Sequence, residues 1–445
     1  GVSVSGPSTR LTIHDKVIIR DNSCKADGGG IHTSGATMEV YDTVTISGNV
    51  AQQSGGGIGS SAYDPFNEDR DDNVAIVREG VNVTGNTASV GGGGVFFDSG
   101  HLTLSDGVLV RNNTSLDLGL GGVEGGGGIS ASNAWVIMQR RVRVVENSAS
   151  GTGGGVLLGS IHESTIQGDV EISDNKAASG GGVVVRGSGR VSIHTNVSMQ
   201  RNTATVNGGA MFAQACTGGC AIWLADSVSV RENYAGQNGA GAHLENLSEL
   251  RTAGHVVISN NHATLKGGAI AAYFKSVVSL SGGTVVQGNA AESGGAIALV
   301  DSRLEAGSLG DSGCLNATLA VITENESTSK SGRGGAIWAF VNSVIDLRDC
   351  VEVTKNAAKQ YGGAVFVGGQ SHFTARGMVV LERNEALEAG GIGALERSTV
   401  TLLDGVQVRG NTARGAGGGV RLEGSTLDAK NSKVFDNTAD HGGGV

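Results

Sequence analysis

The chain has 445 residues and a formal net charge of −10, and 76 of its residues, about 17%, are glycine. Only two prolines are present and glycine does not recur at every third position, which excludes collagen. The acidic balance without a basic run disfavours nucleic acid or an anionic membrane surface as a partner.

One sequence motif repeats along the whole chain. It begins with an aliphatic residue, two variable residues, an asparagine, a variable residue and a small residue, and it is followed by Gly-Gly-(Gly/Ala)-aliphatic. It reads, for example, Ile258-Ser-Asn-Asn261-His-Ala263 followed by Gly267-Gly-Ala-Ile270. Successive asparagines are mostly 26–28 residues apart. The anchor asparagines are Asn22, Asn49, Asn86, Asn113, Asn147, Asn175, Asn202, Asn233, Asn261, Asn289, Asn325, Asn356, Asn384, Asn411 and Asn437. This period predicts repeats that stack on one another.

Between the anchors, short alternating segments such as 228–230 and 399–403 indicate strands, and no helical period is visible. About 27 residues accommodate three strands of five or six residues and three bends. Because crossovers between parallel strands are almost always right-handed, the sequence predicts an all-β, right-handed parallel β-helix of about 15 coils, with roughly 27 residues per coil. We expect a single β-helix domain over residues 1–445, as a segment of a longer chain.

Each position of the motif has an expected role. The anchor asparagine should occupy a bend near left-handed α geometry, with its amide bonded to the matching amide one coil away. The small residue after it should fill a narrow corner, and the paired glycines should allow positive φ and close backbone approach. Charges directly before the anchors recur at one position: Asp174, Arg201 and Glu232, and again Glu324 and Lys355. We expect them to pair modestly on a solvated edge, with a charged binding groove as the alternative.

Inserted loops are expected near residues 60–73, 116–125, 213–220 and 301–316. In solenoids such insertions lie on the surface. The first is dense in acidic side chains and is a weak Ca²⁺ candidate through Asp64, Glu68, Asp69, Asp71 and Asp72. These residues lack the spacing of a calcium loop, so a solvated acidic loop is favoured. No other metal and no cofactor is expected.

The five cysteines divide into two pairs and one remainder. Cys216 and Cys220 are close enough for a local disulfide, and Cys314 and Cys350 could bridge neighbouring coils. Two disulfides fit an oxidising compartment. Cys24 stands at the small corner position and is expected to be a buried thiol. Zinc binding by the first pair is the weaker alternative, because two further ligands would be needed.

Asn-x-Ser/Thr sequons are slightly more frequent than chance and make glycosylation after secretion plausible. Two of them, at Asn113 and Asn325, coincide with anchors, where a glycan would compete with the asparagine ladder. The better acceptor candidates are Asn82, Asn196, Asn246 and Asn316.

The repeated motif resembles the polymorphic outer membrane protein repeat of chlamydial surface proteins, which pairs a GGA(I/L/V) motif with an FxxN motif. The first motif stands here as Gly267-Gly-Ala-Ile270, Gly294-Gly-Ala-Ile297, Gly334-Gly-Ala-Ile337 and Gly362-Gly-Ala-Val365. In the second, an aliphatic residue such as Ile46 or Val353 replaces the phenylalanine. The resemblance implies a right-handed parallel β-helix with passenger, adhesion or surface-scaffold roles and without catalytic residues.

A β-helix polysaccharide lyase or hydrolase is the enzymatic alternative, and it would need carboxylates that converge from neighbouring coils. The only Asp-Asp pair falls in an expected loop. The histidines do not gather at any shared coil position, and the three tryptophans occupy different places in their coils. We therefore expect no catalytic residues.

The favoured function is a non-catalytic extracellular rod, a component of a cell-surface coat or filament, and the second alternative is an adhesin-type passenger. Expected partners are other surface proteins or copies of itself, with glycans as a further class. No nucleic acid partner and no direct membrane insertion are expected. The expected location is extracellular, at the cell surface.

Overall fold

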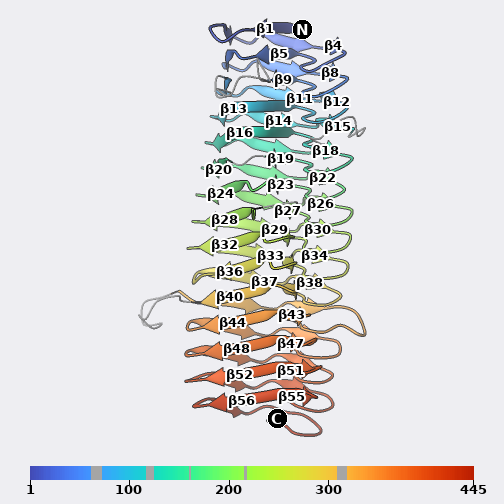
Figure 1. The fold of residues 1–445 in the computed structure, drawn as a ribbon, viewed down its shortest axis with the longest axis vertical. Coiled ribbons are helices and arrows are strands. Elements are labelled where there is room, and N and C mark those ends of the chain that lie inside the picture. The colour runs from blue at the N-terminus through green and yellow to red at the C-terminus, as the bar shows by residue number, and fades with distance from the viewer. Residues whose placement is uncertain (62–72, 117–124, 160–161, 215–217, 308–317) are drawn as a thin grey trace. The chain divides into compact units, whose positions relative to one another are not determined.

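The structure is a computed structural model that describes residues 1–445 except 62–72, 117–124, 160–161, 215–217 and 308–317 (Figure 1). The described residues form strands and no helix. The chain divides into two compact units, Gly1–Ile222 and Trp223–Val445, and the boundary falls inside strand β28 (Ala221–Ala225).

Each unit is a parallel β-solenoid, which confirms the predicted fold class with about 14 turns of about 28 residues in all. The right-handed sense stays a prediction.

One turn contains four short strands rather than the three expected. In unit 2, for example, β35 (Ile270–Tyr273), β36 (Val277–Leu280), β37 (Thr284–Gln287) and β38 (Ala290–Ala291) follow one another. We name these four positions columns A, A′, B and C. The extra bend arises between A and A′, where two residues at positive φ turn the backbone, as at Phe274 (φ 57°) and Lys275 (φ 61°).

The strands of unit 1 stack within their columns (Figure 1). Column A holds β1 (Val2–Ser5), β5 (Ile31–Ser34), β9 (Ile58–Ser61), β19 (Val156–Gly159), β23 (Val183–Arg186) and β27 (Met211–Gln214). Column A′ holds β2 (Arg10–Ile13), β6 (Thr37–Val40), β10 (Val74–Val77), β20 (Glu163–Gln167) and β24 (Arg190–His194). Two longer strands, β13 (Val95–Ser105) and β16 (Ile129–Gln139), run through both columns and join them into one sheet.

Columns B and C of unit 1 form two further sheets. Column B holds β3 (Ile18–Arg20), β7 (Thr45–Ser47), β11 (Asn82–Thr84), β14 (Leu109–Arg111), β17 (Arg143–Val145), β21 (Glu171–Ser173) and β25 (Ser198–Gln200). Column C holds β4 (Ser23–Cys24), β8 (Val50–Ala51), β12 (Thr87–Ala88), β15 (Thr114–Ser115), β18 (Ser148–Ala149), β22 (Lys176–Ala177) and β26 (Thr203–Ala204).

Unit 2 repeats the arrangement. Column A holds β31 (Ala242–Leu244), β35, β39 (Ile297–Val300), β43 (Ile337–Phe340), β47 (Val365–Val367), β51 (Ile392–Leu395) and β55 (Val420–Glu423). Column A′ holds β32 (Glu249–Ala253), β36, β40 (Arg303–Gly307), β44 (Val344–Arg348), β48 (His372–Arg376), β52 (Thr399–Leu403) and β56 (Thr426–Lys430).

Columns B and C of unit 2 complete its turns. Column B holds β29 (Val228–Arg231), β33 (Val256–Ser259), β37, β41 (Ala320–Thr323), β45 (Val351–Thr354), β49 (Val379–Glu382), β53 (Gln407–Arg409) and β57 (Lys433–Phe435). Column C holds β30 (Tyr234–Ala235), β34 (His262–Ala263), β38, β42 (Glu326–Ser327), β46 (Ala357–Ala358), β50 (Glu385–Ala386) and β54 (Thr412–Ala413).

The register places equivalent residues of neighbouring turns directly over one another. In column B of unit 2, Val230, Ile258 and Val286 pair in succession, and all three are fully buried. The aliphatic residue three positions before each anchor thus stacks on the equivalent aliphatic residue of the next turn, along the inside of the solenoid. Since side chains alternate along a strand, a slip of one residue would turn this entire row toward water, so the pattern fixes the register.

The left-handed bend lies one residue before the position predicted. Positive φ falls on the residue preceding the anchor, as at Asp174 (φ 58°), Arg201 (φ 52°) and Lys355 (φ 55°), whereas no anchor asparagine has positive φ. The reason is that the anchor side chain points into the buried interior, so the bend that aims it there must precede it.

The corner and glycine positions match their predicted roles. Ala51, Ala88 and Ala204 are fully buried after their anchors. In the Gly-Gly pair of residues 267–268, the first glycine has φ 64°, and a Cβ on the second would lie 2.3 Å from the Gly295 carbonyl oxygen one turn away. Only glycine fits such an approach.

Candidate functional site

The anchor asparagines form a continuous hydrogen-bonded ladder in each unit. In unit 1, from Asn22 to Asn202, the backbone N–H and the Nδ2 amide of one anchor both donate to Oδ1 of the anchor in the next turn, at 2.9–3.2 Å. In unit 2, from Asn233 to Asn437, the same two bonds measure 2.9–3.0 Å. The side chain therefore acts as donor and acceptor at once, which an aspartate or a leucine cannot do.

The ladder also holds the backbone of the preceding turn. Nδ2 of Asn261 donates a second hydrogen bond to the Val230 carbonyl oxygen at 3.0 Å, and Asn384 does the same to Val353 at 2.9 Å. Both asparagines are at most 1% exposed. Buried polar groups that are fully paired stabilise one register, because any other register would leave them unpaired.

Charged pairs flank the ladder on the solvent side, as the sequence predicted. Arg201 bonds Asp174 of the preceding turn at 2.8 Å, and Lys355 lies 3.9 Å from Glu324. These side chains are 38–56% exposed, so each pair contributes modestly, by about 0.2–1 kcal/mol. They support the register from outside and do not by themselves form a site.

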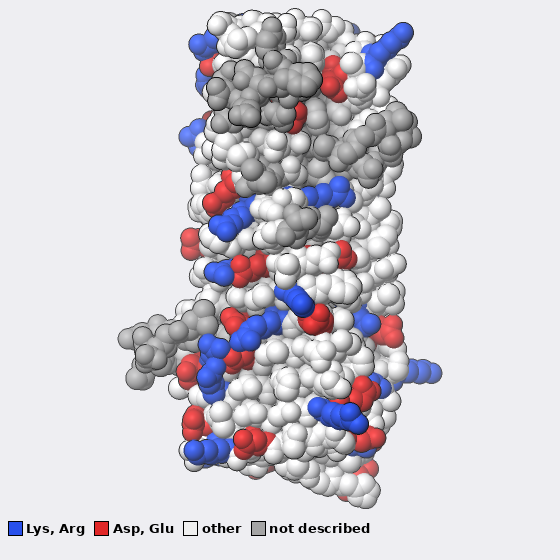
Figure 2. Space-filling model, viewed as in Figure 1, with Lys and Arg blue, Asp and Glu red and all other residues white. Residues whose placement is uncertain are grey.

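A denser charged network lies on column A′ of unit 2. The carboxylate of Asp346 on β44, only 8% exposed, accepts hydrogen bonds from Arg348 Nε at 2.9 Å and Arg376 Nη2 at 3.1 Å, and Arg303 Nη2 lies 3.5 Å away. Burial raises the pKa of Asp346, but the bond from Arg348 and the charges of the arginines outweigh burial and lower the pKa below its ordinary value. Figure 2 shows basic and acidic side chains intermixed on this face at the level of β40 to β48.

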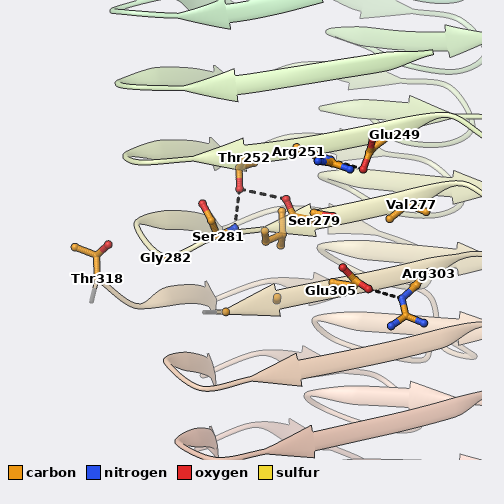
Figure 3. A pocket seen from close by; sticks show the side chains of 13 residues that line it. Glu249, Arg251, Thr252, Val277, Ser279, Ser281, Gly282, Arg303, Glu305 and Thr318 are labelled. Atoms are coloured by element: carbon orange, nitrogen blue, oxygen red, sulfur yellow. Dashed lines mark hydrogen bonds and ion pairs between the residues drawn. The ribbon is translucent and has the colours of Figure 1, made fainter. Parts of the chain in front are cut away.

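Next to this network a cavity of about 760 Å³ opens over β32, β36 and β40 (Figure 3). Glu249 and Arg251 of β32 form an ion pair on one side, and Arg303 Nε contacts Glu305 Oε1 at 2.6 Å on the other side. Hydroxyl groups stand at the end of the cavity away from these pairs (Figure 3). The cavity is of the size that small ligands occupy in proteins.

Sequence reasoning considered the histidines and the tryptophans separately and missed that two histidines meet one tryptophan across neighbouring turns. The rings of His101 and Trp135 stack with centroids 4.5 Å apart, and Trp135 stacks on His162 at 3.6 Å. His101 and Trp135 are register partners on β13 and β16, so parallel stacking brings their rings together. Trp135 and His162 are half-buried and His101 is exposed.

The acidic residues proposed as a weak Ca²⁺ site, Asp64, Glu68, Asp69, Asp71 and Asp72, lie outside the described residues. Within the described ranges, another group of potential metal ligands occurs. His14, Asp15 and Asp42 bring ligand atoms within 4.8 Å of one another at the surface of unit 1. Sequence reasoning missed this group because its members come from two turns.

Cys220 and Cys350 are disulfide-bonded, whereas Cys216 and Cys314, their expected partners, lie outside the described residues. Cys24 is a free thiol, but it is half-buried rather than buried as expected. The reason is that its strand β4 pairs on one side only, with β8, so a single turn covers the corner. Burial nevertheless raises the pKa of its thiol.

The sequon asparagines differ in exposure. Asn196 and Asn246 are exposed at bends, with φ 67° and 54°, and Asn82 is half-buried on β11. Asn316 lies outside the described residues. Asn113 and Asn325, at most 1% exposed, are held in the ladder. A glycan at either anchor would require the ladder to open.

No described segment forms a helix long and apolar enough to cross a membrane.

Residues 255–273 match the model of the Chlamydia polymorphic membrane protein repeat. The matched segment contains anchor Asn261 and the glycine motif of residues 267–270, and it covers β33 to β35. The chain thus carries this repeat, and its parallel solenoid fits a β-helix built from such repeats. No curated protein and no solved structure matches the chain.

Proposed function

We propose that this chain is the non-catalytic β-helix of a surface protein, serving as structural or adhesive material outside the cell. The observation that carries the proposal is the asparagine ladder, which ties every turn of each unit to the next through buried, fully paired amides. A solenoid stabilised in this way maintains a rigid scaffold and leaves its flanks available for partners. The match to a repeat of outer-membrane surface proteins supports the surface location.

The state of the carboxylates in unit 2 supports a role in binding rather than catalysis. A glycoside hydrolase needs one carboxyl group that is free to give a proton and a second that acts as base or nucleophile. Glu249, Glu305 and Asp346, which lie on the same face, are each engaged by arginine. Because each of these three carboxylates is paired with an arginine, none of the three is free to act as the acid or the base.

We propose two classes of partner. Copies of the same chain or other surface proteins would meet the exposed flanks, and glycans would meet the polar face of column A′. In a coat or filament the chain would bind copies of itself or other surface proteins. As an adhesive passenger it would bind both proteins and glycans.

The proposal is tested on the purified chain in three assays. Electron microscopy and sedimentation measure self-assembly, binding of the labelled chain to cell monolayers measures adhesion, and release of reducing ends from pectin and from neutral polysaccharides measures catalysis. Ordered assemblies or saturable cell binding, without turnover, supports the proposal. The proposal would be overturned by multiple turnovers in the polysaccharide assay. It would also be overturned if the chain neither assembled nor bound to cells.

A further inference from the structure

The cavity over β36 is formed by a difference in side-chain size between neighbouring turns. Register pairing aligns Glu249, Val277 and Arg303 across three strands, and Arg251, Ser279 and Glu305 two residues farther on. The central strand therefore carries small side chains between two strands that carry long charged ones. The outer strands are about 9.5 Å apart, which leaves a trough that follows β36.

The charges around this trough alternate. The order is Glu249 then Arg251 on β32, but Arg303 then Glu305 on β40. Across the central strand a carboxylate therefore faces a guanidinium at both positions, as Figure 3 shows. The four charges cancel, so the trough offers donors and acceptors side by side without attracting a strongly charged ligand.

The guanidinium group of Arg251, which lines the trough, retains hydrogen-bond donors. Among the described residues, Arg251 has Glu249 as its ion-pair and hydrogen-bond partner, through Nε. Both of its Nη groups remain available for a ligand, because the pairing with Glu249 uses Nε and holds the planar group in place.

Hydroxyl groups complete the far end of the trough. Thr252 Oγ1 accepts a hydrogen bond from the Ser281 backbone N–H at 3.0 Å and contacts Thr284 Oγ1 at 2.6 Å. The Ser281 side-chain oxygen is buried and has no hydrogen-bond partner among the described residues. Thr252 and Ser281 thus give this end of the trough a polar lining.

We infer that this trough binds an uncharged oligosaccharide of a few sugar units, which deepens the proposed surface function and rests on it. Sugar hydroxyls donate and accept hydrogen bonds at once, so neighbouring hydroxyls match alternating carboxylates and guanidinium groups. The trough follows β36 from Val277 to Leu280 for about 10 Å and continues into the bend at Gly282, which is room for a short saccharide chain. Val277 and the small side chains on its floor accept the apolar faces of the rings.

The test measures binding of cellotriose, maltotriose and N,N′,N″-triacetylchitotriose to the purified chain by calorimetry, with trigalacturonate as the charged comparison. Ser279→Trp fills the trough. An outward tryptophan is accepted at the third residue of such a strand, because Trp223 is exposed at the third residue of β28, which pairs with β32. Thr401→Trp is the matched control, because it occupies the same outward position on β52, away from the cavity.

We expect at least one neutral trisaccharide to bind saturably, with Ser279→Trp weakening it at least about tenfold and Thr401→Trp leaving it unchanged. Affinity should stay constant between about 0.05 and 0.5 M salt, since no net charge is neutralised. Glu305→Gln, which keeps shape and removes the charged acceptor, should weaken binding even if the tryptophan variant is unstable.

Three results would overturn the inference: no neutral probe binds, binding survives both Ser279→Trp and Glu305→Gln, or only trigalacturonate binds and does so in a salt-sensitive way. If any of these three results is obtained while self-assembly or cell binding is intact, the saccharide inference fails and the proposed surface function is retained. Loss of assembly and of cell binding, with saccharide binding retained, would instead remove the proposed function alone.

Discussion

Removal of one ladder side chain tests how much the buried amides contribute to stability. In Asn86→Ala, the side chain loses four hydrogen bonds: two accepted from the N–H and Nδ2 of Asn49, and two donated to the Ile46 carbonyl and to Asn113 Oδ1. The Asn49 N–H and the Ile46 carbonyl are then left unpaired inside the solenoid. Each such group costs about 1–3 kcal/mol, so for the two groups we expect the free energy of unfolding to fall by about 2–6 kcal/mol.

The matched control lies four residues away on the same turn. Asn82→Ala removes a half-buried amide whose bond is to the Gly80 carbonyl at 3.1 Å, and it should cost less than about 1 kcal/mol. Urea denaturation followed by circular dichroism gives both free energies, and hydrogen exchange at the Asn49 amide reports the loss locally. Equal costs for the two variants, or unchanged exchange at Asn49, would refute the assignment of stability to the ladder.

Three further predictions follow from particular contacts. Val341→Gly should raise the free energy of unfolding by about 0.5–1 kcal/mol and raise Tm, because a β-branched residue at φ 55° is strained; a lower Tm would contradict this reading. Asp346→Asn should destabilise the chain at pH 7, and this difference should shrink as the pH falls below about 4, because a carboxylate with a lowered folded pKa contributes stability above its unfolded value and loses it as the pH passes through the folded one. A pH-independent difference between wild type and variant would argue against the arginine network. A double-mutant cycle on Arg201 and Asp174 should give a coupling of about 0.2–1 kcal/mol that declines in salt, and a coupling that salt leaves unchanged would count against it.

The solenoid could be predicted because the features that define it are periodic in the sequence. The anchor asparagine and the aliphatic residue three positions earlier recur in every turn, and parallel stacking converts such recurrence into rows of contacts. The bend position was harder to assign, because the residue before the anchor varies from Asp174 to Arg201. The signal was present in Gly48 and Gly410, which occupy that position in other turns with φ 64° and 60°.

The surface features depended on register across turns. His101 and Trp135 both stand about twelve residues before their anchors, Asn113 and Asn147, so counting back from the anchors would have found their stack. The trough could not be found in this way. Arg303 lies much farther from its anchor, because residues 308–317 intervene, and only the structure places it opposite Glu249.

The most direct test of the in-register solenoid is the distance between spin labels on exposed positions of column C in unit 2, measured by pulsed electron paramagnetic resonance in a Cys24→Ser background. His262 and Glu385 are separated by four register steps, and His262 and Thr412 by five. With strands about 4.8 Å apart, we expect label distances near 19 Å and 24 Å, increasing by one strand spacing per turn. Distances that do not increase with the number of turns would contradict the parallel stacking on which the ladder and the trough depend.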